Sequence, residues 1–234
     1  MSDWAAVILA AGMGTRMESD LPKVLHRVCG KEMIRHVVDA VRAAHSGPVV
    51  VVVAPEAARV RQCLGDSVEY VEQAEARGTG HALLQAEEVL RGRASRLLVL
   101  YGDIPLILPS TLSRLMEQHQ DTGAVATLLT TDRVPPHGLG RIVRDVTSGQ
   151  VVDVVEEADA DEVRRAITEV NGGVYGFQAE WLWPALRELA VSAAGEYYLT
   201  NLVRMARLRR VVVESVSSEE GLEVLGVNNR VQLA

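Results

Sequence analysis

Short apolar runs alternate with amphipathic segments through the first half of the chain. Runs that are apolar at nearly every position predict buried strands, and apolar residues at helical spacing predict helices between them. The predicted strands cover residues 4–11, 48–54, 68–73 and 96–103. The predicted helices cover residues 33–45, 55–65, 78–92 and 109–120. This alternation is typical of a parallel sheet covered on both faces, in which ligands bind at the carboxyl ends of the strands.

The second half of the chain is less regular and richer in strands. Strands are predicted at 123–131, within 140–157 and at 167–177, and a helix is predicted at 178–189. The segment 140–157 indicates two strands joined by a turn at Ser148 and Gly149. We therefore expect an α/β fold, in which a mostly parallel sheet is flanked by helices and a smaller β-rich lobe is added at the sheet edge.

The composition fits one large domain with an aliphatic core, because 48% of the 234 residues are hydrophobic and only 4% are aromatic. The net charge of −7, without an evident basic patch, argues against a nucleic-acid partner. The chain has no apolar stretch of roughly 20 residues and no signal-peptide pattern at its N-terminus, so we expect no membrane insertion. Cys29 and Cys63 lack metal-type spacing and are expected to be buried, reduced thiols, which favours a cytoplasmic location.

The first predicted strand runs into a loop that contains Gly12 and Gly14. Such a pair is as typical of a tight turn as of a backbone that approaches a ligand closely. Met17 occupies the third glycine position of the dinucleotide-binding pattern G-x-G-x-x-G, and the P-loop pattern G-x-x-x-x-G-K-[ST] is absent as well. The loop therefore belongs to neither of these phosphate-binding classes.

Two basic residues, Arg16 and Lys23, follow the glycine loop. Loop charges are ordinarily solvated, but this chain has 22 arginines and only two lysines. A lysine beside Pro22 in such an arginine-rich sequence indicates that a compact ammonium is needed there rather than a planar guanidinium.

Two further features lie on the same rim of the predicted sheet. Asp103 follows the apolar run of the fourth predicted strand, where a carboxylate is either an acidic turn residue or a ligand of Mg²⁺. Gly78, Thr79 and Gly80 open the predicted helix 78–92, where free N–H groups form either an ordinary cap or a site for an anion or a base edge.

No Ser–His–Asp or Cys–His arrangement can be assigned, and this is compatible with one reaction class. A phosphate monoester carries about −1.5 to −2 charge at pH 7, so it can attack without a general base. The obstacle is then the repulsion between two anions. In-line positioning and neutralisation by Mg²⁺, Lys and Arg overcome such repulsion, and these are the groups that the rim supplies.

The segment LAAGMGTRMESDLPKVLH resembles the signature of sugar-nucleotide pyrophosphorylases, LAAGxGTRM…PK. Eight segments in chain order extend the resemblance over nearly the whole sequence: LPKVLHRVCGK, QAEARGTGHAL, LYGDIPLI, GLGRIVR, VVEEADAD, EVNGGVY, GEYYLTN and GVNNRVQLA. Together they resemble the N-terminal uridyltransferase domain of the bacterial bifunctional enzymes that make UDP-N-acetylglucosamine. The resemblance implies a Rossmann-like nucleotidyltransferase fold over residues 1–234, with a nucleotide-binding half at roughly 1–110 and a sugar-binding half at roughly 111–234.

The resemblance also implies roles for individual residues. Arg16 and Lys23 would be the catalytic pair that neutralises phosphates. The nucleotide would be held by Leu9, Ala10, Ala11, Gly12 and Gly14, and its uracil would be read by Gln73, Gly78 and Thr79. Mg²⁺ would be bound by Asp103 and Asn228, with Tyr101 and Gly102 alongside. The N-acetylglucosamine moiety would be bound by Gly140, Glu156 and Asn171, with Glu196, Tyr198 and Thr200 in a motif near that sugar.

Three positions depart from the family pattern on the sugar side. Leu139 stands where the family often has Tyr, Gly172 where it usually has Thr, and Asn201 where it usually has an acid. These departures bear on the choice of acceptor sugar more than on the nucleotide chemistry.

The family's bifunctional members continue into a left-handed β-helix that acetylates glucosamine-1-phosphate and supplies much of a trimer contact. The present sequence contains no hexapeptide repeat, so we expect no acetyltransferase activity from it. Whether the chain forms an oligomer through such a domain is left open by the sequence.

We therefore expect Mg²⁺-dependent uridylyl transfer from UTP to N-acetylglucosamine-1-phosphate, with in-line attack on the α-phosphate and release of pyrophosphate. One alternative is the same chemistry on another sugar-1-phosphate or nucleotide. Another is a non-catalytic module that binds nucleotide sugars. A dinucleotide-dependent oxidoreductase is disfavoured by Met17.

Overall fold

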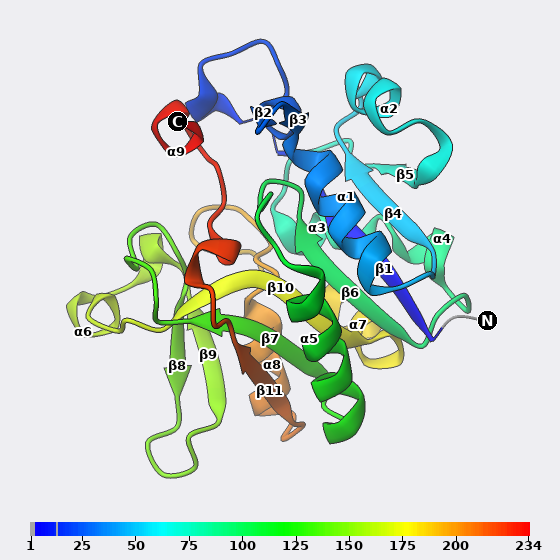
Figure 1. Ribbon diagram of the computed structural model, residues 1–234. Helices are drawn as coiled ribbons and strands as arrows, with labels where there is room; N and C mark the ends of the chain where they lie inside the picture. Colours follow the sequence, from blue (N-terminus) through cyan, green and yellow to red (C-terminus); the bar gives the residue numbers. More distant parts are fainter. Residues whose placement is uncertain (1–2, 13) are drawn as a thin grey trace.

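The computed structural model describes residues 3–12 and 14–234 of the chain (Figure 1). Within these residues nine strands form one sheet in the spatial order β11-β7-β10-β6-β1-β4-β5, with β8 paired to β10 and β9 paired to β8. The strands of this sheet are β1 (Trp4–Leu9), β4 (Val49–Val53), β5 (Glu69–Glu72), β6 (Arg96–Tyr101), β7 (Ala126–Thr131), β8 (Arg141–Arg144), β9 (Val151–Val155), β10 (Val170–Gln178) and β11 (Val213–Ser217). A separate two-stranded sheet joins β2 (Arg27–Val28) to β3 (Lys31–Glu32).

The strands of the first half are parallel, as their apolar runs predict. β1 pairs in parallel with β4 on one side and with β6 on the other, and β4 pairs in parallel with β5. β10 is antiparallel to both β6 and β7, whereas β11 runs parallel to β7. The strand-rich second half therefore continues the same sheet, and its β8–β9 hairpin projects beside β10 (Figure 1).

Helices cover both faces of the sheet. One face is covered by α1 (Met33–Ala44), α2 (Ala58–Leu64) and α5 (Pro109–Thr122), and the other by α3 (Thr79–Leu84), α4 (Glu87–Leu90), α7 (Ala179–Arg187) and α8 (Asn201–Leu208). The helices α6 (Glu162–Arg165) and α9 (Arg230–Leu233) have four residues each. In β1, Ala6 and Ile8 join the first apolar layer, while Ala5 and Val7 join the second. Side chains of a strand alternate between its faces, so a strand that is apolar throughout is buried on both, and the expected fold class is confirmed.

Two predicted helices differ from the observed ones. The helix expected at 55–65 begins only at Ala58, and Pro55 lies before the helix rather than in its first turn. The helix expected at 78–92 divides into α3 and α4. At the division, Gln85 N donates to Ala82 O at 3.2 Å and Ala86 N donates to Leu83 O at 3.0 Å. These bonds span three residues instead of four, and such tightening is typical of a helix end.

Several short elements were not predicted by the sequence pattern: β2, β3, α6, α8, β11 and α9. Two-residue strands and four-residue helices are too short to establish a period. β11 follows a run of arginines and has only two buried residues, Val213 and Val216. Its place in the sheet depends on its parallel partner β7, which local sequence does not reveal.

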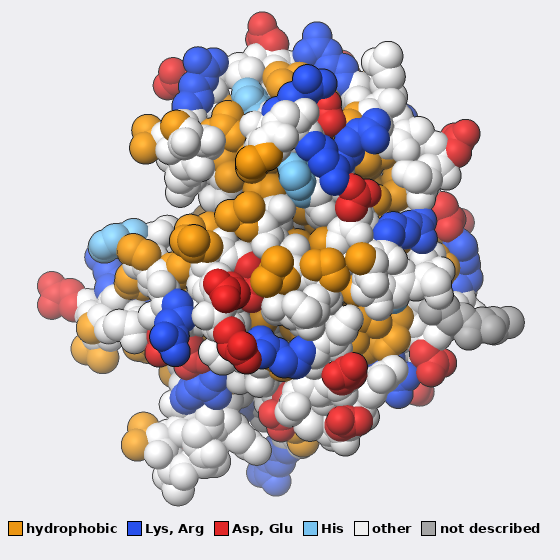
Figure 2. Space-filling model, in the orientation of Figure 1, with side chains coloured by type: hydrophobic (Ala, Val, Ile, Leu, Met, Phe, Trp, Pro, Cys, Tyr) orange, Lys and Arg blue, Asp and Glu red, His pale blue; other side chains and the backbone are white. Residues whose placement is uncertain are grey.

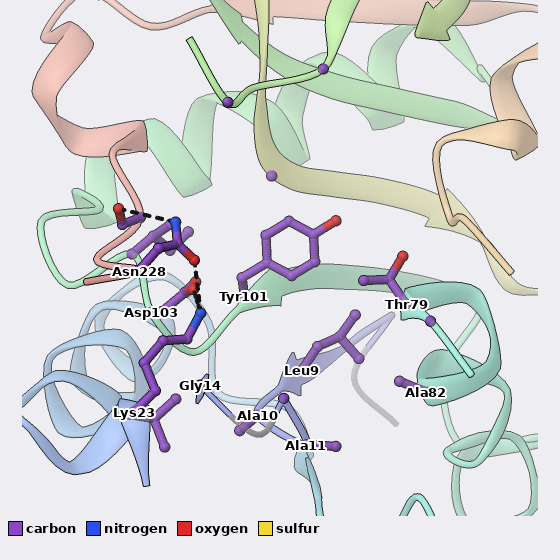
Figure 3. A pocket seen from close by; sticks show the side chains of 18 of the residues that line it. Leu9, Ala10, Ala11, Gly14, Lys23, Thr79, Ala82, Tyr101, Asp103 and Asn228 are labelled. Carbon is purple, nitrogen blue, oxygen red and sulfur yellow. Dashed lines mark hydrogen bonds and ion pairs between the residues drawn. The ribbon is translucent and has the colours of Figure 1, made fainter. Parts of the chain in front are cut away.

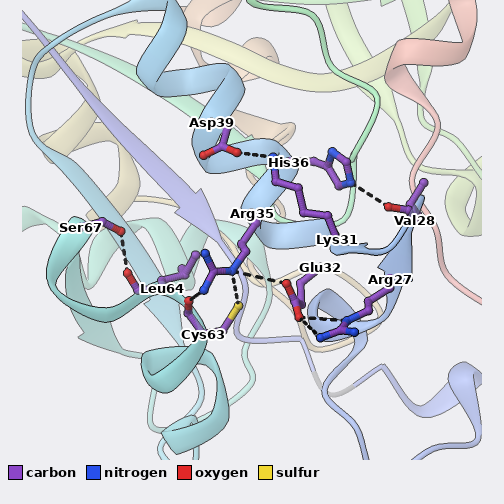
Figure 4. A network of polar contacts seen from close by, with 10 residues as sticks. All are labelled: Arg27, Val28, Lys31, Glu32, Arg35, His36, Asp39, Cys63, Leu64 and Ser67. Carbon is purple, nitrogen blue, oxygen red and sulfur yellow. Dashed lines mark hydrogen bonds and ion pairs between the residues drawn. The ribbon is translucent and has the colours of Figure 1, made fainter.

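The expectation that both cysteines are buried was wrong. Cys29 is exposed at the turn between β2 and β3, with a φ of 50°. Cys63 is half-buried on α2, where Arg35 Nε lies 3.2 Å from its sulfur (Figure 4). The same guanidinium, on α1, also lies beside Glu32 of β3. This polar network joins the small hairpin to two helices. The Cys63 sulfur therefore has a polar neighbour that the sequence did not indicate.

On the face shown in Figure 2, basic and acidic side chains are interspersed and the surface is indented on one side. On this face, therefore, no broad patch of one charge sign is formed. In the part of the chain that the structure describes, no helix is long and apolar enough to cross a bilayer.

His119 of α5 is buried between the helix and the sheet. Its Nδ1 lies 2.9 Å from Thr127 Oγ1, and its ring packs edge-on against Trp4 at 5.4 Å. Burial and, to a smaller extent, the positive charge of Arg96 together lower the pKa of His119 from 6.5 to about 4. The folded protein therefore holds this imidazole neutral at pH values where the unfolded chain protonates it.

We predict that this histidine makes the fold sensitive to acid. Its contribution to stability is fully present above pH 6.5 and is lost as the pH falls from 6.5 towards 4, because the unfolded chain then takes up the proton first. The loss should amount to about 1–3 kcal/mol. Urea unfolding between pH 7.5 and 4.5 should give a steeper pH dependence for the wild type than for His119→Gln. His137→Gln changes an exposed histidine and serves as the control; equal slopes for wild type and His119→Gln would refute the prediction.

Candidate active site

A pocket of about 650 Å³ opens where the carboxyl ends of β1 and β6 meet the start of β10. Nearly all the site residues expected from the sequence line it. These are Leu9, Ala10, Ala11, Gly12, Gly14, Arg16, Lys23, Gln73, Gly78, Thr79, Tyr101, Asp103, Gly140, Glu156, Asn171, Glu196 and Asn228. Residues more than 200 positions apart thus share one rim, as expected for ligands at the strand ends of a parallel sheet. Met13, inside the glycine loop, lies outside the described residues.

Three expected residues do not line the pocket. Gly102 is buried, and a Cβ there would lie 2.9 Å from Ile34 Cδ1, so the position must stay small. Tyr198 and Thr200 do not line the pocket either, although Thr200 contacts a residue that does. The structure adds lining residues that the sequence reasoning had not singled out: Thr15, Val24, Ala76, Ala82, Ile104, Gly138, Gly173, Val224 and Gly226. Most are small or apolar side chains, for which a sequence pattern offers no sign of a ligand.

A cluster of charged and amide groups occupies one end of the pocket (Figure 3). Lys23 Nζ donates to Asp103 Oδ2 and, at 3.0 Å, to Asn228 Oδ1. The Lys23 and Asp103 side chains are only 15% and 14% exposed, so water screens this ion pair weakly. Arg16 Nη2 lies 3.4 Å from the same Asn228 oxygen. The ammonium therefore sits between two ligand-type oxygens, with a guanidinium beside them.

The glycine loop brings Lys23 close to the end of β1. Gly14 has a φ of +60°, and a Cβ at this position would lie 2.6 Å from Lys23 Cβ. No other residue fits both the left-handed backbone and the close approach. The loop is also tied to the C-terminal segment, because Arg230 donates to the carbonyl oxygens of Met17 and Glu18, at 2.9 Å each. The glycine loop thus positions the Lys23 side chain, in addition to forming a turn.

The C-terminal segment that carries Asn228 is fixed by a buried carboxylate. Glu223 is 2% exposed and accepts hydrogen bonds from Thr111 Oγ1 at 3.0 Å, Ser218 Oγ at 2.5 Å and Leu108 N at 3.3 Å. A buried carboxylate is tolerated only when such donors satisfy it. These bonds attach the segment to the first turn of α5.

The same segment is then attached to the end of β6. Val227 N donates to Asp103 O at 2.9 Å, next to the two side chains that contact Lys23. The main-chain hydrogen bond to Asp103 therefore positions Asn228 opposite the Asp103 carboxylate. The separation of Asp103 and Asn228 is thus set by the main chain.

The two oxygens that bind Lys23 also suit a divalent cation. Mg²⁺ is commonly bound by one or two protein carboxylates, with phosphate and water oxygens completing its shell. Asp103 Oδ2 and Asn228 Oδ1 are close enough to contact one ammonium, so they are close enough to share one metal ion. Among the described residues no group of three His, Cys, Asp or Glu side chains could hold a metal. The donor set thus fits a cation that is completed by a ligand's phosphates.

Another end of the pocket contains Gln73, which is 6% exposed. Its Nε2 donates to Gly78 O at 3.1 Å and lies 3.0 Å from His81 Nδ1. With the amide nitrogen engaged, Oε1 is the atom that Gln73 can offer to a ligand N–H, such as one on a base edge. The expectation of free N–H groups at the start of α3 was wrong for Gly80, whose N–H donates to Tyr197 O at 2.8 Å.

The opposite wall is built by the β8–β9 hairpin and β10. Glu156 accepts a hydrogen bond from Thr200 Oγ1 at 2.7 Å. Burial raises the pKa of the Glu156 carboxyl, and the Thr200 hydrogen bond opposes that rise. Arg141 is 1% exposed, donates to Leu139 O and forms an ion pair with Glu157 at 2.5 Å. This buried arginine thus links Leu139 to Glu157, the neighbours of Gly140 and Glu156, which line the pocket.

The three departures from the family pattern have different surroundings. Leu139 and Gly172 line the pocket, whereas Asn201 begins α8 outside it. A Cβ on Gly172 would lie 2.9 Å from Val224 Cγ1 and 3.0 Å from Leu129 O. A larger residue there requires the neighbouring backbone of β7 to move. The glycine is therefore matched to the local packing.

Comparisons with known proteins identify what this chain is similar to. The family described as "MobA-like NTP transferase domain" matches residues 6–179. The chain is 47% identical over 233 residues to "Bifunctional protein GlmU" of Pelotomaculum thermopropionicum, covering 99% of this chain and 51% of that protein. It is 46% identical over 235 residues to the protein of the same name from Halalkalibacterium halodurans, covering 100% of this chain and 51% of that one. The chain thus spans about half the length of the curated relatives that it matches.

A solved structure supports the fold independently. The structure described as UDP-glucose pyrophosphorylase complexed with UDP-glucose superposes with a TM-score of 0.76, covering 95% of this chain and 96% of that one. The two sequences are only 18% identical, so the likeness establishes the fold alone.

We predict that Lys23 and a divalent cation compete for the same two oxygens. Lys23→Met keeps the side-chain length but removes the charge, so it should raise the affinity of the ligand-free protein for Mn²⁺ by about tenfold or more. Isothermal titration with Mn²⁺, without nucleotide, measures the effect. Lys31→Met is the matched control, because the other lysine of the chain pairs with Asp39 and does not line the pocket. Equal Mn²⁺ affinities for Lys23→Met and Lys31→Met would show that the two cations do not compete.

Proposed function

The chain belongs to the family of MobA-like NTP transferase domains, and we propose that it transfers the uridylyl group of UTP to N-acetylglucosamine-1-phosphate. The products are UDP-N-acetylglucosamine and pyrophosphate. The observation that carries this proposal is the cluster of Lys23, Arg16, Asp103 and Asn228 at one end of the pocket. Support for the choice of substrates comes from the similarity to bifunctional GlmU proteins over the whole chain.

The two halves of the chain would divide the work of binding. The half at roughly 1–110 supplies the glycine loop, Lys23 and Gln73, which suit the phosphates and base of UTP. The half at roughly 111–234 supplies Gly140, Glu156 and Asn171, which suit the hydroxyl and amide groups of a sugar. Asn228 belongs to the second half but faces Asp103 of the first, so the reacting phosphates would lie where the halves meet.

The reaction needs no protein nucleophile. A phosphate oxygen of the sugar-1-phosphate forms a bond to the α-phosphorus of UTP, and the bond from that phosphorus to the bridging oxygen of pyrophosphate breaks. The attacking group is already an anion, so no base must remove a proton from it. The barrier arises from charge, and Lys23 and Arg16 would lower it by neutralising the transferred group. Mg²⁺ bound at Asp103 and Asn228 would supply further positive charge beside the phosphates.

We further propose that the reaction takes place in the cytoplasm. Cys29 and Cys63 are free thiols, and Cys29 is exposed. An exposed thiol is best preserved in a reducing compartment.

The charged, nucleotide-sized pocket is in keeping with small-molecule substrates rather than with a macromolecular partner.

The second candidate is the same chemistry on a different sugar. Leu139 and Gly172 stand on the sugar side of the pocket and differ from the family pattern described above. Hydrogen-bonding groups on a pocket wall discriminate strongly between sugars, whereas an apolar residue such as leucine discriminates weakly. The identity of the sugar is therefore the part of the proposal that most needs measurement.

The proposal predicts pyrophosphate release from UTP and Mg²⁺ in the presence of N-acetylglucosamine-1-phosphate. A coupled assay should compare this sugar with glucose-1-phosphate and glucosamine-1-phosphate. Release mainly with the acetylated sugar supports the full proposal, and release mainly with another sugar supports the second candidate. Binding of UTP without release of pyrophosphate with any of the three would contradict both and favour a non-catalytic binding module.

We also predict that Lys23→Arg lowers turnover by about 10²-fold, since a planar guanidinium cannot occupy the space of a compact ammonium between two oxygens. The measurement is kcat under saturating substrates. Lys31→Arg makes the same exchange outside the pocket and should leave kcat unchanged. Near-normal kcat in Lys23→Arg would remove Lys23 from the catalytic machinery.

A further inference from the structure

Tyr175 lies outside the pocket but contacts two residues that line it. It stands on β10, is 1% exposed, and its hydroxyl oxygen lies 2.6 Å from Asn171 Nδ2 and 3.4 Å from the Tyr101 hydroxyl oxygen. Asn171 and Tyr101 both line the pocket, and Figure 3 shows Tyr101 beside the polar cluster. The Tyr175 hydroxyl therefore connects two groups that a ligand can reach, although the ligand cannot reach the hydroxyl itself.

The direction of the first hydrogen bond is fixed by a main-chain group. Gly173 N, which can only donate, lies 3.3 Å from Asn171 Oδ1. The other atom of that amide, Nδ2, is therefore the donor to Tyr175. One hydrogen of Nδ2 is used in this bond and the second is left for a ligand.

The second contact of the Tyr175 hydroxyl has no fixed direction. Its oxygen lies 3.4 Å from the Tyr101 hydroxyl oxygen, and either phenol can be the donor. A phenol oxygen has two lone pairs, so Tyr175 can accept from Asn171 Nδ2 whichever way its contact with Tyr101 runs. The hydrogen bond to Asn171 is therefore the contact whose direction the structure defines.

The rings have little freedom to change this arrangement. Tyr175 stacks on Phe177 with ring centres 5.7 Å apart, and it meets the Tyr101 ring edge-on at 6.4 Å and 81°. Gly173 has a φ of +71°, and a Cβ there would lie 2.6 Å from Tyr101 Cδ2. The Tyr101 ring thus packs directly against main chain, so the free variable at each phenol is the rotation of its hydroxyl hydrogen.

The pairing of β10 explains how Asn171 and Tyr175 come together. The register of β10 against β7 shifts between these two residues, at the position of Gly172 and Gly173. A regular strand would separate residues four apart by about 13 Å. The irregular segment and the length of the tyrosine side chain bring the hydroxyl back to the amide.

We propose that Tyr175 is a positioning residue that orients the Asn171 amide, so that the second hydrogen of Nδ2 is offered to an acceptor oxygen of the sugar substrate. The inference rests on the proposed function, since it assigns the sugar end of the same pocket. An acetamido carbonyl oxygen has two lone pairs and accepts two donors. A free amine, protonated at neutral pH, has no lone pair and cannot accept the Asn171 hydrogen. Tyr175 would therefore favour an acetylated sugar without touching it.

The test is Tyr175→Phe, which removes the hydroxyl and retains the ring. We expect the KM for N-acetylglucosamine-1-phosphate to rise about tenfold, with the KM for UTP unchanged. The preference for this sugar over glucosamine-1-phosphate should fall by a similar factor. Tyr70→Phe is the matched control, because the Tyr70 hydroxyl donates to Gly65 O at 2.6 Å and does not line the pocket. Thermal unfolding of both variants verifies that each is folded.

Two kinetic outcomes would overturn the inference. One is an unchanged KM for the sugar phosphate, and the other is a parallel rise of both KM values, which would indicate a general structural role. A second measurement does not depend on activity. The side-chain amide resonances of Asn171 in the ligand-free protein should shift in Tyr175→Phe and stay unchanged in Tyr70→Phe. If the wild type released no pyrophosphate, the proposed function would fail. An unshifted Asn171 amide in Tyr175→Phe would separately refute the role of the hydrogen bond between Tyr175 and Asn171.

Discussion

The site depends on one ion pair that is held away from water. Lys23 and Asp103 come from loops that follow different strands, and the two loops meet because β1 and β6 are parallel neighbours. The pair is incomplete without Asn228, which is brought to it by the bond between Val227 N and Asp103 O at 2.9 Å. The segments that carry Asp103 and Asn228 are thus held together by a main-chain hydrogen bond, and the Lys23 side chain reaches between them. Preorganised charge of this kind stabilises a reacting phosphate without reorganisation at the moment of reaction.

The same arrangement would allow an acidic protein to bind the anionic substrates proposed for it. The chain carries a net charge of −7, yet one ammonium and one guanidinium face the pocket where the phosphates would lie. The ammonium contacts the Asp103 carboxylate and the Asn228 amide oxygen. These two residues would hold a metal ion, which would supply further positive charge beside the phosphates, and Lys23 would then be available to contact the substrate. Local positive charge at one rim would thus take the place of the broad positive field that nucleic-acid-binding proteins use.

Much of the fold and of the pocket could be predicted from sequence, and the limits have physical causes. Long apolar runs such as 48–54 identify buried parallel strands because both faces of the strand are covered. Asp103 could be singled out because a carboxylate directly after such a strand falls on the ligand rim, and Lys23 because it is one of only two lysines in an arginine-rich chain. Tyr175 could not, since an apolar-looking position inside a strand gives no sign that its hydroxyl supports two pocket residues. Cys29 was misjudged because its exposure depends on a turn between two-residue strands. Glu223 was also missed, since its donors lie in α5 and in the loop after β11.

The most direct test is a crystal structure with a non-hydrolysable UTP analogue and Mg²⁺, from which the distance between Lys23 Nζ and the α-phosphate oxygens is measured. If the pocket performs uridylyl transfer as described, Lys23 will have left Asp103 and will lie within hydrogen-bond distance of an α-phosphate oxygen, about 2.7–3.2 Å. Asp103 and Asn228 will then contact the metal. A structure in which the nucleotide is bound while Lys23 remains paired with Asp103, out of reach of the α-phosphate, would contradict the central role given to this ion pair.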